Sequence, residues 1–130
     1  MDAKILRVIE DQMRCWPAVK GLDAFIKECS ESGTFWLGDE LPPWMREMDF
    51  DELEIRSALE FLRPELTARQ IGYLEAWTAV WQTLREDGTF HRRVKEVLGG
   101  RLSWPAYRKE TEEVLGRPIP RSHWWFWPDE

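Results

Sequence analysis

The residue types that most often carry catalysis are scarce in this chain and stand outside known motifs. The two histidines, His91 and His123, lack the HExxH, HxE or Cys–His context that makes a zinc ligand or an activated nucleophile. We interpret each as an ordinary surface or tail residue, although a lone imidazole can titrate near neutral pH. Cys15 and Cys29 fit no zinc spacing and are too few for a disulfide framework, so we interpret both as reduced core thiols.

Phosphate cradles and paired carboxylates are not indicated either. The chain contains no GxGxxG or GxxxxGKS/T run, and Gly99-Gly100 is interpreted as a helix stop. Glu112 and Glu113 are neighbours on a predicted helix, so their carboxylates point in different directions. The sequence therefore predicts a protein that is not an enzyme and that needs no metal or cofactor.

Negative charge is concentrated in one segment. Residues 39–60 hold eight acidic and two basic side chains, a balance of −6 that equals the formal net charge of the whole chain. Such a segment would steer a partner with a basic surface and raise its association rate. The residues that we predict to contact this partner are Trp36, Asp39, Glu40, Trp44, Glu47, Asp49, Asp51, Glu52 and Glu54.

The alternative interpretation of these acidic residues is a solvated helix face. Asp51, Glu52 and Glu54 also suit the positive N-terminal end of a helix dipole, which would explain them without any partner. Glu47 and Asp49 have no such local explanation, because they lie in an irregular, Pro-rich stretch where binding groups often sit.

A basic stretch follows in the second half of the chain. Its cations could line a phosphate track with Trp104 or Tyr107 stacking on a base, or they could neutralise acidic residues within the protein. A pI near 5.1 disfavours nucleic acid as a partner. A nucleic-acid-binding regulator using residues 92–109 stays an alternative; the cations are Arg92, Arg93, Lys95, Arg101, Arg108 and Lys109, opposed only by Glu96.

Nine tryptophans in 130 residues are an unusual endowment. Trp77 and Trp81 lie one helical turn apart on one apolar stripe, which predicts core positions. Trp124, Trp125 and Trp127 stand in a tail that contains three prolines. Two interpretations are open for them: the tail packs back on the helices, or these indoles anchor a partner, since tryptophan is enriched among binding hot spots.

Helical periodicity runs along most of the chain, whereas strict apolar–polar alternation of strand length is hard to find. The sequence predicts an all-α, compact single-domain array of about six helices with an irregular Trp/Pro-rich C-terminal tail. We divide it into a helical domain of residues 1–116 and a tail of residues 117–130 that packs on it or on a partner. The expected helices are 2–16, 17–30, 51–62, 67–86, 89–98 and 103–115, with one short helical turn in a loop over 34–50.

These features together predict a small acidic protein that binds and inhibits another macromolecule. The most specific form is an immunity-type protein that blocks a bacterial toxin; the alternative is a phage-type inhibitor whose acidic face imitates nucleic acid. The chain has no asparagine and thirteen Arg against five Lys, which indicates a GC-rich, bacterial or phage gene. No stretch approaches the 18 or so apolar residues of a membrane span, so we expect a cytoplasmic protein without a membrane partner.

Overall fold

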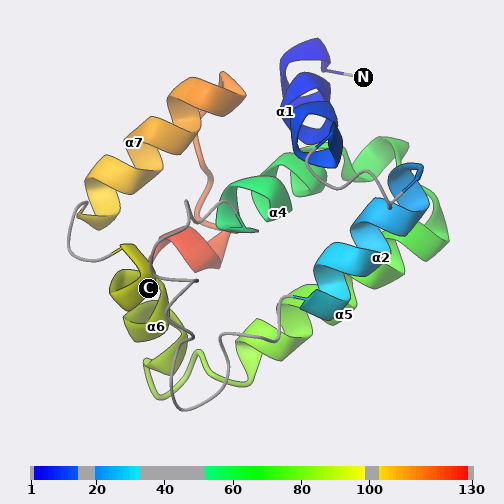
Figure 1. The fold of residues 1–130 in the computed structure, drawn as a ribbon. Helices are drawn as coiled ribbons and strands as arrows, with labels where there is room; N and C mark the ends of the chain where they lie inside the picture. Colours follow the sequence, from blue (N-terminus) through cyan, green and yellow to red (C-terminus); the bar gives the residue numbers. More distant parts are fainter. Residues whose placement is uncertain (1, 15–19, 33–51, 99–102, 129–130) are drawn as a thin grey trace.

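Helices account for all the regular secondary structure in the part of the chain that the computed structural model describes, residues 2–14, 20–32, 52–98 and 103–128 (Figure 1). This confirms the predicted all-α class. The expected helical turn in 34–50 lies outside the described residues. The α-helices are α1 (Ala3–Arg14), α2 (Leu22–Ser32), α4 (Glu52–Phe61), α5 (Ala68–Gln82), α6 (Thr89–Leu98) and α7 (Trp104–Leu115), and the two 3₁₀ turns are η2 (Arg63–Glu65) and η3 (Trp124–Phe126).

A capping box begins α5. The amide of Gln70 donates to Thr67 Oγ1 at 3.2 Å, and the amide of Thr67 donates back to Gln70 Oε1 at 2.9 Å. The Gln70 side chain also donates to Asp23 at 2.7 Å, which ties the start of α5 to α2. Helix α7 has its predicted ends, because Ser103 caps it through the Ala106 amide and Gly116 takes the left-handed conformation.

Two helix ends lie four or more residues from the predicted ones. Helix α2 begins at Leu22, not directly after Pro17, and Gly21 before it has a positive φ of 90° that a helix cannot contain. Helix α5 ends at Gln82, several residues before Gly88, because the amides of Leu84 and Arg85 bond three residues back and tighten the chain into turns.

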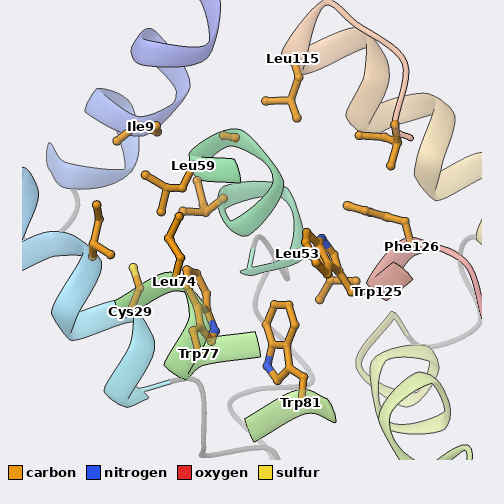
Figure 2. Packing of buried hydrophobic residues seen from close by; sticks show 14 of the residues in the cluster. Ile9, Cys29, Leu53, Leu59, Leu74, Trp77, Trp81, Leu115, Trp125 and Phe126 are labelled. Atoms are coloured by element: carbon orange, nitrogen blue, oxygen red, sulfur yellow. The ribbon is translucent and has the colours of Figure 1, made fainter. Parts of the chain in front are cut away.

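Helix α4 lies at the centre of the core (Figure 1, Figure 2). Nearly every side chain from Leu53 to Leu59 is buried, on all sides of the helix, so α4 is enclosed by its neighbours. Trp77 and Trp81 of α5 are fully buried beside it, as the helical spacing predicted. Their rings meet edge to face at 5.5 Å, a favoured geometry for an aromatic pair.

The C-terminal tail belongs to the same core. Ile119, Trp125 and Phe126 are buried, and η3 lies among α4, α6 and α7 (Figure 1). The tail thus packs back on the helices, one of the two interpretations left open by the sequence. The division into a domain of 1–116 and a tail of 117–130 stays a prediction. Within the described ranges, no helix combines the length and apolarity that a bilayer crossing demands.

Candidate functional site

The acidic segment predicted to contact a partner is described only at its end. Trp36, Asp39, Glu40, Trp44, Glu47, Asp49 and Asp51 lie outside the described residues. Glu52 and Glu54 occupy the first turn of α4, where carboxylates suit the helix dipole, and both side chains are half-buried. They flank Leu53, which is fully buried, so the segment already enters the core between its last two predicted contact residues.

Glu60, at the end of this segment, is neutralised within the chain. Arg56 donates to Glu60 Oε1 at 2.9 Å, and Arg63 donates to both of its carboxylate oxygens. Burial opposes ionisation of Glu60, but the hydrogen bonds and charges of Arg63 and Arg56 outweigh it and hold the pKa of that carboxyl below its usual range. Arg63 also reaches Glu75 of α5 at 3.1 Å, and Arg56 reaches Thr78 at 3.3 Å.

Because Glu60 is paired with Arg56, the two charges cancel and the net charge of the remaining acidic segment is unchanged. Removing Glu60 and its partner Arg56 from the eight acidic and two basic residues of 39–60 leaves seven acidic residues and Arg46. The balance of −6 therefore falls within residues 39–54. The Arg56–Glu60–Arg63 network itself joins α4 to α5.

The tryptophans of the tail differ in exposure. Trp125 is buried in the core, whereas Trp124 and Trp127 are half-buried (Figure 2 shows Trp125). Arginines lie over all three indoles at distances typical of cation–π contacts. The guanidinium of Arg85 is 4.7 Å from Trp124, that of Arg56 is 4.9 Å from Trp125, and those of Arg108 and Arg121 are 3.9 and 4.5 Å from Trp127. In this conformation Trp125 is too deeply buried to contact a partner. The prediction that Trp124 and Trp127 anchor a partner is not tested.

His123 stands in the tail, but the interpretation of either histidine as an ordinary surface residue is wrong, since both side chains are buried. Ser57 of α4 joins two residues of the tail: Trp125 Nε1 donates to Ser57 Oγ at 2.8 Å, and that oxygen lies 2.9 Å from Nδ1 of His123. Burial lowers the pKa of His123 to about 4; Glu60 opposes this shift and Arg56 adds to it. The imidazole is therefore neutral at physiological pH.

A serine and a histidine at this distance could form a nucleophile and base, but the surroundings argue for a structural role. Ser57 is fully buried and its oxygen already accepts from Trp125, so no substrate reaches it in this structure. No pattern in the sequence marks Ser57, because it stands off the apolar positions of its helix, Ile55, Ala58 and Leu59. Its hydrogen bonds to the tail can be recognised only in the folded chain, where His123 and Trp125 contact Ser57.

His91 contacts Trp124, the first residue of η3, the turn that also contains Trp125. Its Nε2 lies 3.3 Å from the carbonyl oxygen of Trp124, and its ring packs edge to face with Phe90 and Trp104. A carbonyl oxygen can only accept, so Nε2 carries the proton in this contact. Both histidines of the chain thus lie between the tail and the helices.

The basic stretch is partly used inside the molecule. Arg93 is buried, and Arg108 donates to the carbonyl of Phe126 at 2.8 Å while its guanidinium covers Trp127. Arg92, Lys95 and Lys109 are exposed. Arg101 lies outside the described residues. Burial therefore removes Arg93 from the surface, and internal contacts occupy Arg108, two of the cations that a phosphate track would need.

Other chemistry is limited in the described ranges. No three His, Cys, Asp or Glu side chains there come together as a metal site would require. Cys29 is a buried free thiol, as predicted, and burial with the nearby charges of Glu52 and Glu28 raises its pKa to about 12. The prediction that Cys15 is a reduced core thiol is not tested, since Cys15 lies outside those ranges.

Comparison of the chain with protein-family profiles, curated proteins and solved structures found no match.

Proposed function

We propose that the protein binds a macromolecule with a basic surface through residues 36–54 and blocks it, most specifically as an immunity-type protein against a bacterial toxin. The observation that supports this is the location of charge: seven carboxylates and one arginine fall within residues 39–54. A cationic partner is steered to such a segment, and its association rate depends on ionic strength.

The internal contacts of the arginines support the same proposal. Arg56 and Arg63 are bound to Glu60, and Arg117 reaches Asp2 at 3.3 Å. Arg85, Arg108 and Arg121 lie over tail indoles. Many of the cations that could have neutralised residues 39–54 thus have other contacts. The buried Arg93 and the engaged Arg108 give the nucleic-acid-binding alternative less support.

The test begins with affinity capture of the partner from the native host. An inhibitor of one toxin should capture a single basic enzyme, whereas a phage-type nucleic-acid mimic should capture a large nucleoprotein complex. Association kinetics are then measured with the captured partner for a triple variant, Glu47→Lys, Asp49→Lys and Asp51→Lys. We expect slower association and a weaker dependence on salt.

A matched control separates this segment from net charge. Glu10, Glu110 and Glu113 are exposed acidic residues on α1 and α7, and their reversal to lysine changes the net charge by the same amount. This control should leave most of the association rate intact. Equal slowing in both triple variants, or no slowing in the first, would remove residues 36–54 as the docking surface.

A further inference from the structure

The tail connects four helices through one short turn. Trp125 of η3 hydrogen-bonds Ser57 of α4 and packs 6.0 Å from Trp81 of α5. Trp124 packs 5.0 Å from Phe90 of α6, and Phe126 packs 5.1 Å from Tyr107 of α7. Because these contacts converge on η3, the position of the tail and the positions of α6 and α7 depend on one another.

One titratable side chain lies at the centre of this junction. His123 is 3% exposed and lies against α4, with Nδ1 2.9 Å from the fully buried Ser57 Oγ. Its ring is 4.8 Å from that of Phe61 and stacks on Trp125 at 5.0 Å. The imidazole is thus enclosed by aromatic rings and one hydroxyl.

The only carboxylate among the described charges that act on His123, Glu60, is already shared by two arginines. Arg56 and Glu60 of α4 act on it directly, and Arg63 of η2 binds the same Glu60. Arg117 of the tail lies over the Phe61 ring that borders the imidazole. A protonated His123 would therefore add a further cation to a carboxylate already shared by two arginines.

We propose that the C-terminal tail is an acid-sensitive latch, which is held on α4 while His123 is neutral and is released when His123 is protonated. Release would uncover Trp125 and Phe126 together with the core residues that they cover. This inference does not depend on the proposed function.

The direction and size of the effect follow from proton linkage. Burial lowers the pKa of His123 to about 4 in the docked tail, whereas a detached tail would have the ordinary value of 6.5. Above pH 6.5 both forms are neutral and docking is unaffected. As the pH falls from 6.5 toward 4, the detached form gains a proton more readily than the docked form, so the docking equilibrium constant falls. The fall is about 100-fold by pH 4 and about 300-fold once both forms are protonated.

The experiment is amide hydrogen exchange on the full chain between pH 7 and pH 4, analysed as protection factors that correct for the intrinsic effect of pH. We expect protection of residues 119–127 to fall progressively below pH 6.5, by up to about 100-fold at pH 4, while the amides of α2 and α5 stay protected. No fall in the tail, or an equal fall in the tail and in α2 and α5, would overturn the latch.

Variants assign the effect to one residue. His123→Phe keeps a ring between Phe61 and Trp125 but cannot titrate, so the acid-induced loss should disappear. His91→Gln is the matched control, since it removes the other imidazole but keeps a donor for the Trp124 carbonyl. Glu112→Gln is a second control, because Glu112 accepts from the Ile119 amide at 2.7 Å and an amide oxygen can replace it. Acid-induced loss that survives His123→Phe, or that vanishes in either control, contradicts the proposal.

A measurement on the unmodified chain covers the case in which His123→Phe does not fold. The two imidazoles can be followed by NMR, and the His91→Gln spectrum assigns them. His123 should titrate near pH 4 when the tail is docked. A titration midpoint near 6.5 with the tail still protected would show that protonation and docking are not linked.

Discussion

Replacement of Ser57 by alanine tests whether this hydroxyl joins the tail to the helices. The Ser57 oxygen accepts from Trp125 Nε1 at 2.8 Å and lies 2.9 Å from His123 Nδ1, with all three side chains buried. Alanine leaves two buried polar nitrogens without a partner, at about 1–3 kcal/mol each. We therefore expect the free energy of unfolding to fall by about 2–6 kcal/mol, a large part of the roughly 5–15 kcal/mol of an ordinary domain.

The assay is urea unfolding at pH 7.5, where both forms of His123 are neutral, followed by circular dichroism. Ser30→Ala is the matched control, because Ser30 also stands in a helix but its hydroxyl donates to the carbonyl of Lys27 in the same helix, at 2.7 Å. It should change the free energy of unfolding by no more than about 0.5 kcal/mol.

A double-mutant cycle isolates the bond between Ser57 and Trp125. Trp125→Phe removes the N–H donor, so its effect and that of Ser57→Ala should overlap by about 1–3 kcal/mol in the double variant. If the two effects simply add, or if Ser57→Ala costs no more than Ser30→Ala, the structural role assigned to this hydroxyl is refuted.

Three further predictions concern other parts of the core. Glu60→Gln leaves the buried Arg56 without its carboxylate and should lower the free energy of unfolding, measured in urea, by about 3 kcal/mol. Glu75→Gln is the control, because the Glu75 side chain is 66% exposed and its loss should change that free energy by less than about 1 kcal/mol. Equal effects of the two variants would contradict the buried network. Gly116→Ala should lower the melting temperature, at a cost of about 1 kcal/mol, because φ is 76° at that position. Gly72→Ala inside α5 should raise the melting temperature, since nothing lies within 4 Å of the added Cβ and alanine favours the helix by a similar amount. Changes of the same sign in the two variants would refute this reasoning. Cys29 should resist alkylation by iodoacetamide at pH 8 in the native protein and react in urea, because burial raises the pKa of its thiol to about 12. Peptide mass mapping distinguishes Cys29 from Cys15, and rapid labelling of Cys29 in the native protein would show that its thiol is accessible.

The sequence alone determined where several helices begin and end and which stripe faces inward. Thr67 and Gln70 could be recognised as a capping box because both partners lie within one turn, and Gly116 marks the end of α7 for a similarly local reason. Trp77 and Trp81 were assigned to the core from helical spacing alone. The acidic residues 39–51 were also found by counting, but their arrangement lies outside the described part of the chain.

Tertiary structure decided the surroundings of the polar residues. His123 and Ser57 are 66 positions apart, so nothing near either residue in the sequence indicates that they meet or that the imidazole is buried. The same holds for Arg56, which is 2% exposed although it is a charged residue off the apolar positions of its helix. Local spacing fixes backbone hydrogen bonds within a turn, whereas burial and pKa depend on which distant segments come into contact, and only the folded chain contains that information.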